Sequence, residues 1–486
     1  MADVPSRQDQ LHSYQYSLQR VVAALVTHDP DPHRSPLRRA GITALISLVI
    51  AMLAVTGAAI WGALRGSNGQ DPRDPSALFV EKGTGAQYVY LESDSKLHPV
   101  LNYTSGLLVA NSTEPKVVSE SRQRLAEVPL GDPVGIPDAP NSLPTRRDLL
   151  PAAWTICTLL SPGSTSTAAP RSLLAVGDSV TDGAVLPVPD TRTLPTQLRA
   201  LLVSDPTGQT FLVYANRRFK IPDNRVRQTG TRFGWSTPPI AVAAAWSNAI
   251  PAGPEFAAAP IPGSGERSSA LPGYPVGQIL RMPGPRPNGT DTWGVVLRDG
   301  VADITAVQAL LMQTDLGAAN PTDTDPDVYG NLKHSAIDVI DQGLPPAPPV
   351  LLGKPTNGMC LTYTAGSGAN GNLSIRLDPT IPSGTPVASR SDVPGSVQAD
   401  AVHVPRGKGA LVVAVASPSA PASSGTVSIV TDTGLQYPVA SRDILGKLGF
   451  AGIQPVQVPA QLVALLPQGP SLDATKARQS KPDTGN

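Results

Sequence analysis

Residues 40–64 read AGITALISLVIAMLAVTGAAIWGAL, and this stretch decides how the chain is organised. It contains no charged residue from end to end. At a rise of about 1.5 Å per residue, it exceeds the roughly 20 residues that an α-helix needs to cross the apolar core of a bilayer. The sequence therefore predicts one transmembrane helix over residues 40–64.

Charged residues at the two ends of this stretch predict its orientation. Arg38 and Arg39 stand just before it and Arg65 closes it, so the basic excess places residues 1–39 in the cytoplasm. Trp61 lies one turn from the outer end, where an indole ring prefers the headgroup region. A cleaved signal peptide is the competing interpretation, but about 40 residues precede the apolar run and no clear A-x-A cleavage site follows it.

The rest of the chain has the composition of a β-rich protein with several domains. About 420 residues follow the span, which is enough for two or more domains. The formal net charge is zero and gives no argument for a nucleic-acid partner. The 52 prolines and 44 glycines predict many turns and short elements, and a hydrophobic fraction of 41% is too high for a disordered stalk.

Both cysteines, Cys157 and Cys360, follow the predicted span. Their position suggests one disulfide in an oxidising compartment. A structural zinc site is a weaker explanation, because two residues do not make a tetrahedral site and no C-x-x-C spacing is present. Two buried free thiols are the remaining alternative.

Residues 8–28 predict an amphipathic helix in the cytoplasm, because apolar residues recur at spacings of three and four. A single helix is not a folded domain, so its apolar stripe needs a partner, either a protein or the membrane surface. Arg20 is the one basic residue on the helix, which favours a protein. The predicted docking residues are Leu11, Tyr14, Leu18, Val21 and Leu25.

Four segments of twelve residues share a β-run, a polar turn and a proline or apolar residue at the end, and each predicts a β-hairpin. Two of them are followed by a second landmark, a proline and then Gly-Pro, 29 residues after the last proline of the hairpin. We therefore expect small α/β modules of roughly 50 residues, repeated at irregular intervals. The segments and their expected turns are 88–99 (Asp94-Ser95), 211–222 (Asn216-Arg217), 293–304 (Asp299-Gly300) and 427–438 (Thr433-Gly434), and the landmarks begin at Pro251 and Pro467.

Residues 148–186 and 350–418 are rich in short apolar runs, and each segment holds one cysteine. Pairing them predicts a central β-rich domain made from discontinuous chain and joined by the two cysteines, with two modules inserted between its halves and one at each end. The expected parts are 1–39 (cytoplasmic helix and basic collar), 40–64 (span), 65–147 (first module and linker), 148–186 (first central half), 187–260 (second module), 261–349 (third module), 350–418 (second central half), 419–471 (fourth module) and 472–486 (disordered tail).

Several short motifs along nearly the whole chain recur in a known family. The most specific are LHPVLN at 97–102 and GIPDAP at 135–140, with Trp154-x-x-Cys157 and the closing LLPQGPSLD at 465–473 in support. On these motifs the sequence resembles the EccB family, which comprises bitopic core components of type VII (ESX) secretion systems in mycobacteria and related actinobacteria. Residues 29–35 depart from the family pattern, in which a longer basic stretch is expected.

The resemblance implies a single-pass inner-membrane protein with a short cytoplasmic helix and a large periplasmic α+β region. It implies four small repeat modules around a β-rich central domain that a disulfide staples. It also implies oligomerisation, assembly with EccC, EccD and EccE, and contact with a mycosin protease.

Members of this family have been labelled ATPases, an activity that requires a nucleotide site. A P-loop needs G-x-x-x-x-G-K-[ST], because backbone amides, a lysine and a hydroxyl hold the phosphates and magnesium. Three Gly-Lys pairs occur, ending at Lys354, Lys408 and Lys447, and none is followed by Ser or Thr. We interpret them as glycine turns with solvated lysines.

A second enzymatic alternative begins at Gly177-Asp178-Ser179, which is similar to the first block of an SGNH esterase. Asp400-x-x-His403 would supply its base and orienting carboxylate. The G-x-N-D block is missing and no βαβ pattern flanks the serine, so a turn after a core strand is the preferred interpretation.

We therefore predict a structural core subunit of a type VII secretion complex that forms its periplasmic part by self-association. No catalytic, cofactor-binding or metal-binding residue is predicted, and no cofactor. The alternatives are an ATP-hydrolysing subunit of the same system and a protein that binds the cell wall, the second resting on location alone.

Overall fold

A computed structural model gives the fold as two compact units, residues 1–74 and 75–486, and each unit is described on its own. The described residues are 6–27, 36–66, 70–151, 153–160, 169–190, 192–193, 195–284, 291–339, 343–364, 372–387, 396–416 and 420–479. The predicted departure from the family pattern at residues 29–35 lies outside them.

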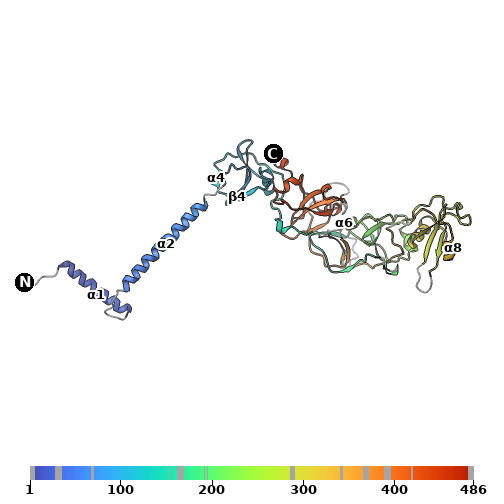
Figure 1. Cartoon of the computed structure of the whole chain (residues 1–486), viewed down its shortest axis with the longest axis horizontal. Coiled ribbons are helices and arrows are strands. Elements are labelled where there is room, and N and C mark those ends of the chain that lie inside the picture. Colours follow the sequence, from blue (N-terminus) through green and yellow to red (C-terminus); the bar gives the residue numbers. More distant parts are fainter. Residues whose placement is uncertain are drawn as a thin grey trace, which may run out of the picture. The chain divides into compact units, whose positions relative to one another are not determined.

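The first unit contains two helices, α1 (Arg7–Thr27) and α2 (Pro36–Gly66), both drawn in blue in Figure 1. Within α2, Gly41–Trp61 has a mean hydropathy of 2.3 and none of it is buried against other residues. It is the one helix among the described residues that is long and apolar enough to cross a membrane. The predicted helices over 8–28 and 40–64 are thus confirmed as helices.

Among its described residues, the second unit contains five β-sheets. Four of them share one order of four strands, and the second of these sheets has β16 (Val350–Leu351) as a fifth strand. In each of the four, the first strand pairs antiparallel with the second, the second forms a hairpin with the third, and the fourth joins the free edge of the first in parallel. All four predicted hairpins are present. The turn of the second one is Ala215-Asn216, one residue earlier than predicted, because Arg217 already pairs with Tyr214.

Helices follow the third strand of each of these sheets. The first sheet contains β1 (Ala77–Glu81), β2 (Gln87–Leu91), β3 (Lys96–Pro99) and β4 (Lys116–Glu120), with α3 (Tyr103–Val109) and α4 (Arg122–Leu125). The second contains β8 (Arg199–Ser204), β9 (Thr210–Tyr214), β10 (Arg217–Lys220) and β11 (Ile240–Ala241), with α5 (Val226–Arg232) and α6 (Ala244–Ala249). The third contains β12 (Ile279–Met282), β13 (Thr292–Val296), β14 (Val301–Ile304) and β15 (Thr322–Asp323), with α7 (Ala306–Asp315) and α8 (Pro326–Gly330). The fourth contains β21 (Ala410–Val415), β22 (Thr426–Val430), β23 (Gln436–Pro438) and β24 (Val456–Pro459), with the 3-10 turn η4 (Arg442–Leu445) and the helices α9 (Ala460–Val463) and α10 (Ala474–Ala477).

The landmark glycines lie where the chain returns to the third strand of its sheet. In the fourth sheet, Gln436 donates its N–H to Pro467 and accepts from the N–H of Gly469. A Cβ on Gly469 would stand 2.4 Å from the ring of Tyr437, so only glycine fits there without a shift. A Cβ on Gly253 would likewise stand 2.4 Å from the ring of Phe219. Corresponding return bridges join Leu97 to Leu130, Arg218 to Ala252 and Val301 to His334.

The fifth sheet has seven strands from two distant parts of the chain, in the order β19-β20-β6-β5-β17-β18-β7. Its centre is the antiparallel pair β5 and β17, in which Cys157 stands directly opposite Cys360 and is bonded to it by a disulfide. The strands are β5 (Ala153–Leu159), β6 (Arg171–Val176), β7 (Ala184–Val185), β17 (Gly358–Thr364), β18 (Asn372–Leu377), β19 (Thr385–Pro386) and β20 (Ala401–His403).

Hydrophobic cores cross the boundaries between neighbouring sheets. Trp154 of the seven-stranded sheet, Trp246 of α6 and Leu462 of α9 belong to one buried cluster. Leu108 of α3 shares a second cluster with Phe450, which follows η4, and Figure 1 shows these red and light-blue parts side by side. A third cluster joins the second sheet to α7. The sheets of this unit are therefore packed on one another and not strung on linkers.

Three predicted boundaries differ from the structure. Strand β21 lies in the predicted second central half but pairs with β22 and β24 of the fourth sheet. Likewise, β16 (Val350–Leu351) pairs with β8 of the second sheet. The tail expected to be disordered from 472 is ordered up to 479, since Leu472 and Ala477 are fully buried. The pairings of β16 with β8 and of β21 with β24 join residues that are far apart in sequence, and the ordered part of the tail is too short to carry a periodic pattern.

Candidate functional surfaces

Helix α1 presents an apolar stripe that no described residue covers. Its side chains have exposed fractions between 51% for Leu18 and 75% for Leu25, whereas Ala23 is buried. Such a stripe is costly in water and marks an interaction surface. The predicted docking residues Leu11, Tyr14, Leu18, Val21 and Leu25 all lie on this exposed stripe.

The predicted anchor residues all lie on α2. Trp61 has an exposed fraction of 60% at the C-terminal end of the candidate span. Arg38, Arg39 and Arg65 fall in the first and last turns of the helix, and their side chains are outside the described residues. The long apolar face between the two ends contains large exposed side chains such as Leu53 and Val55, which suits contact with lipid.

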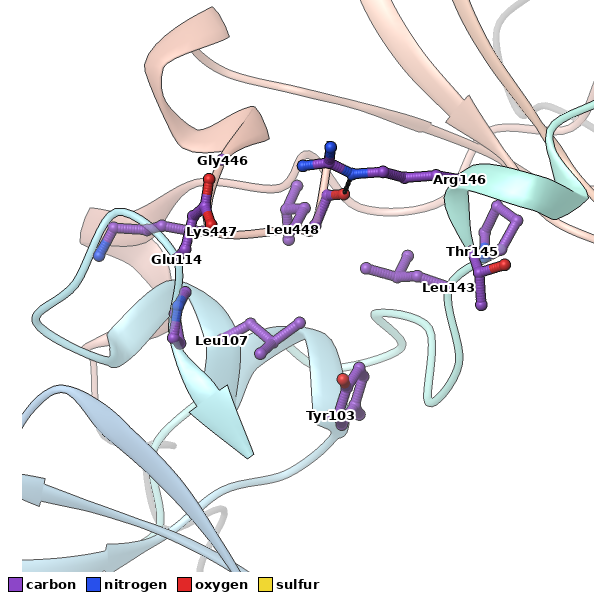
Figure 2. A pocket seen from close by; sticks show the side chains of 12 residues that line it. Tyr103, Leu107, Glu114, Leu143, Thr145, Arg146, Gly446, Lys447 and Leu448 are labelled. Carbon is purple, nitrogen blue, oxygen red and sulfur yellow. Dashed lines mark hydrogen bonds between the residues drawn. The ribbon is translucent and has the colours of Figure 1, made fainter. Parts of the chain in front are cut away.

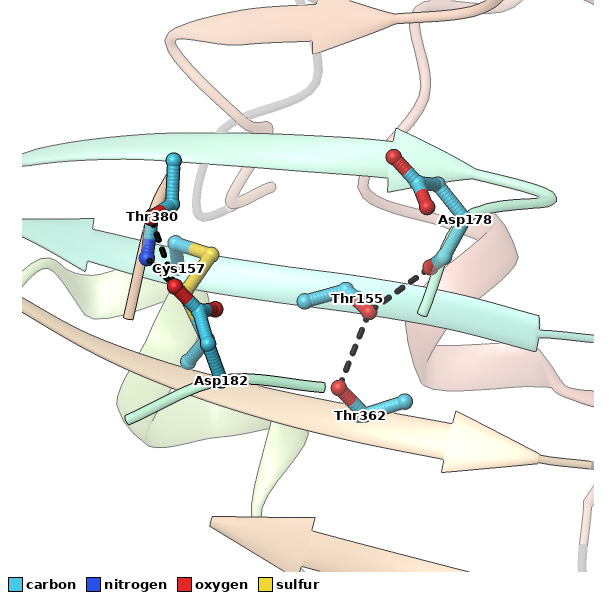
Figure 3. The surroundings of a disulfide bond; sticks show 7 residues. Thr155, Cys157, Asp178, Asp182, Thr362 and Thr380 are labelled. Carbon is cyan, nitrogen blue, oxygen red and sulfur yellow. Dashed lines mark hydrogen bonds between the residues drawn. A yellow bond between two sulfur atoms is a disulfide. The ribbon is translucent and has the colours of Figure 1, made fainter. Parts of the chain in front are cut away.

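The disulfide lies on one face of the seven-stranded sheet, and two loop segments cover that face (Figure 3). Val180 comes from the segment after β6 and Ile381 from the segment after β18. The hydroxyl and the N–H of Thr380 both donate to Asp182, at 2.6 and 2.9 Å, and so join the two segments. These hydrogen bonds lower the pKa of the Asp182 carboxyl group.

The residues of the esterase-like motif have structural contacts. Gly177 has a φ of +74° and a Cβ there would stand 2.4 Å from Leu150, so the glycine makes the turn after β6. Ser172 donates its hydroxyl and its N–H to Asp400, at 2.7 and 2.8 Å. His403 places Nδ1 2.8 Å from the carbonyl oxygen of Ser383. Asp400 and His403 thus have structural hydrogen bonds at the two ends of β20, and Ser179 is exposed.

The three Gly-Lys pairs separate into two kinds. Lys354 and Lys408 are exposed, as predicted for solvated lysines. Lys447 is half-buried and donates to the carbonyl oxygens of Leu108, at 3.3 Å, and of Ala110, so its prediction as a solvated lysine is wrong. Burial lowers the pKa of its ammonium group, and the positive charge of Arg478 lowers it further.

Lys447 and Arg478 together cap the C-terminal end of α3. Arg478 donates to Val109 at 3.5 Å, one residue from the carbonyls that Lys447 contacts. Both cations suit the negative end of the helix dipole and satisfy carbonyls that have no partner within the helix. They come from the opposite end of the chain, and no local sequence pattern predicts this contact.

A pocket of about 370 Å³ lies at this junction. In Figure 2, Tyr103 and Leu107 reach it from α3, Leu143 and Arg146 from the linker before the seven-stranded sheet, and Leu448 from the segment after η4. Arg146 donates from Nε to the carbonyl oxygen of Gly449 at 2.9 Å, which ties the linker to the fourth sheet. The pocket is therefore part of the joint between the first and fourth sheets.

No group of three or more His, Cys, Asp or Glu side chains that could hold a metal ion occurs among the described residues.

Comparison with known proteins identifies relatives over nearly the full length. The profile of a family described as type VII secretion system ESX-1, transport TM domain B, matches residues 4–484. A protein of Mycobacterium tuberculosis H37Rv named ESX-3 secretion system ATPase EccB3 is 27% identical, over 96% of this chain and 88% of its own. ESX-1 secretion system ATPase EccB1 from the same strain is 26% identical, over 96% of this chain and 93% of its own.

Two solved structures have the same fold. A chain in the intact ESX-5 inner membrane complex superposes with a TM-score of 0.62 at 22% identity, over all of this chain and 97% of that one. A chain in the EccB3 dimer from the ESX-3 core complex gives a TM-score of 0.63 at 25% identity, over 83% of this chain and all of that one.

Proposed function

Because this chain belongs to the EccB family of type VII (ESX) secretion systems, we propose that it is a structural core subunit of such a complex in the inner membrane. The observation that carries the proposal is the match over residues 4–484, which includes the helix α1, the candidate span and all five sheets. The cores shared between sheets give a rigid body suited to a scaffold.

The proposed orientation places residues 1–39 in the cytoplasm and the unit after the span in the periplasm. Arg38 and Arg39 support this orientation through the positive-inside rule. The disulfide between Cys157 and Cys360 supports it as well, because disulfides persist in oxidising compartments.

We further propose that the four sheets with this common strand order are copies of one repeat module arranged around the seven-stranded domain. Their common strand order supports this, as does the return bridge to the third strand that recurs in each. The proposed domain order along the chain is first module, first central half, second and third modules, second central half and fourth module. The fourth module then begins with β21.

The proposed partners divide between the two sides of the membrane. The stripe of α1 would dock inner-membrane subunits resembling EccC, EccD or EccE, since the dimer and the inner membrane complex among the structural relatives are multi-chain assemblies. The unit after the span would pair with a second copy of the chain. A mycosin protease is a further proposed partner, resting on the family resemblance alone.

ATP hydrolysis is the second candidate function, because the curated relatives carry the word ATPase in their names. This sequence contains no G-x-x-x-x-G-K-[ST] motif, and we therefore assign ATP turnover to a partner subunit. Phosphate release by the purified full-length protein tests this assignment. Turnover that persists after removal of every co-purifying protein would contradict it.

The scaffold proposal is tested by native mass spectrometry of gently solubilised membranes that contain the tagged chain. We expect several copies of the chain together with a multi-span subunit and an ATPase subunit. A variant with L11E, L18E and L25E adds three charges to the stripe and should lower partner recovery at least tenfold. A control with H12E, S13E and Q19E adds three acidic side chains at exposed positions about 120° or more from the middle of the stripe and should retain the partners.

Two results would contradict the proposal. The first is a lone monomer under conditions that keep other membrane complexes intact. The second is equal recovery of partners with the stripe variant and its control, which would remove α1 as the docking element.

A further inference from the structure

A cleft of about 690 Å³ lies between the second and third sheets, where α5 meets α7. Every side chain that lines it is polar, and two carry a positive charge. The lining residues are Arg227, Gln228, Thr231 and Arg232 of α5 and Gln313 and Thr314 of α7.

The four residues from α5 share one side of the helix. At 100° per residue, positions 227, 228, 231 and 232 fall within an arc of about 140°. Thr229 projects from the opposite side and is fully buried. Helix α5 thus packs against the protein through Thr229, and the side chains of Arg227, Gln228 and Arg232 line the cleft.

Among the described residues the cleft has no acidic lining residue, and the one carboxylate of α7, that of Asp315, forms an ion pair with Arg225 at 4.0 Å. The closest acidic residue in the sequence of α7 is Asp315, which accepts the N–H of Ala258 at 2.7 Å. Arg225 donates to the carbonyl oxygens of Thr314 and Asp315, at 2.9 and 3.1 Å, and so caps the negative end of α7. Arg227 and Arg232 are left facing a cleft without an anion of its own.

The free donors suit an oxyanion with two negative charges. The hydroxyls of Thr231 and Thr314 donate to backbone carbonyls of their own helices, which leaves the guanidinium groups and the side-chain amides for a ligand. A guanidinium group binds phosphate or carboxylate oxygens through paired hydrogen bonds. Two guanidinium groups match the charge of a phosphate dianion, whereas a single carboxylate would neutralise only one.

We propose that this cleft binds a phosphate-bearing ligand, a function beyond the scaffold role. The ligand is either an inorganic phosphate chain or a nucleotide. The cleft contacts the phosphate groups, which both kinds of ligand share. Binding here requires no hydrolysis, since nothing in the cleft activates water.

The test uses the full-length protein in a maltoside detergent and a buffer without phosphate, at constant ionic strength. Isothermal titration with pyrophosphate measures the dissociation constant. The variant R227Q/R232Q should weaken binding at least tenfold, and R227K/R232K should retain part of it because the charge remains while the paired hydrogen bonds are lost. The control R147Q/R406Q removes two exposed arginines elsewhere and should change binding less than twofold.

Separate titrations distinguish the sources of phosphate. Pyrophosphate binding as tightly as ATP indicates an inorganic ligand, and ATP binding at least tenfold tighter indicates a nucleotide, so that both results support the proposal. Three results would overturn the proposal. The first is that citrate binds as tightly as pyrophosphate, and the second is that R147Q/R406Q weakens binding as much as R227Q/R232Q. The third is that no phosphate species binds to wild-type protein that has a native circular dichroism spectrum. None of these outcomes depends on whether the protein assembles with secretion subunits.

Discussion

Lys447 shows how one residue acquires a role that its neighbours in the sequence do not indicate. The Gly-Lys pair is typical of an exposed turn, yet the ammonium group reaches the carbonyl oxygens at the end of α3. Its lowered pKa reflects burial first and the charge of Arg478 second. The contact joins distant parts of the chain, because Lys447 and Leu108 are 339 positions apart in sequence.

The Asp182 carboxylate makes the stability of the folded protein depend on pH. Its pKa is lower in the folded state than the ordinary value because Thr380 donates two hydrogen bonds to the carboxylate. The stabilisation is therefore present above the unfolded-state pKa and is lost as the pH falls through the folded-state pKa. We expect D182N to have a lower unfolding temperature than wild type at neutral pH, and to lose less stability than wild type on acidification.

The measurement is the thermal unfolding midpoint of the full-length protein at pH values from about 6 to about 3. Asp178 provides the matched control, because the contact of this residue shown in Figure 3 is made through its backbone carbonyl oxygen. D178N should show the acid sensitivity of wild type. Equal acid sensitivity of D182N and wild type would show that ionisation of Asp182 does not contribute to stability.

At the scale of elements, the β5–β17 pair holds the two halves of the seven-stranded sheet together. The disulfide closes a loop with a sequence separation of 203, and in the chain-entropy model such loops gain about 5 kcal/mol at most. We expect C157A/C360A to lower the opening free energy of amides in β5 and β17 by about 2 to 5 kcal/mol. Hydrogen exchange of the full-length protein measures this effect strand by strand.

Reduction provides the control for this prediction. Wild-type protein treated with a thiol should approach the exchange pattern of C157A/C360A, and the same thiol should leave the variant unchanged. An effect of the thiol on the variant, or no effect on wild type once free thiols are detected, would contradict a stabilising role for the bond.

At the scale of the whole second unit, the C-terminal segment, residues 471–479, contacts both the fourth sheet and α3 of the first sheet and so fastens them together. Leu472 donates its N–H to Pro438 and bridges the chain to Val439, while Ala477 packs in the core that contains α3. Arg478 adds its hydrogen bond to Val109. The segment is polar in sequence, and its two buried apolar residues fix its position together with these hydrogen bonds.

Truncation tests this fastening. Deletion of residues 471–486 removes a buried leucine and one of the two caps of α3, so the opening free energy of amides in α3 should fall by about 2 to 5 kcal/mol. Deletion of residues 480–486 leaves every described contact in place and should change little. Hydrogen exchange of α3 compared with β17 shows whether the effect is local. Equal protection of α3 in both truncations would disprove the fastening.

The sequence by itself determined the features whose signal is local. An uncharged apolar run is enough to specify the helix α2, because its length is matched to the bilayer and not to other residues. The spacing of Leu11, Leu18 and Leu25 indicated the exposed stripe of α1, and alternation around short turns indicated the four hairpins. Two cysteines after the span left one pairing for a disulfide.

Only the tertiary structure decided which segments meet. Strands β16 and β21 belong to sheets other than predicted, because a strand's partner depends on backbone hydrogen bonds that its side-chain pattern does not encode. The cap of α3 by Lys447, the ordered tail and the cleft between α5 and α7 all join residues from different sheets. Such contacts form when packed elements bury apolar surface together, and so they are fixed by the assembled fold and not by any single stretch of the chain.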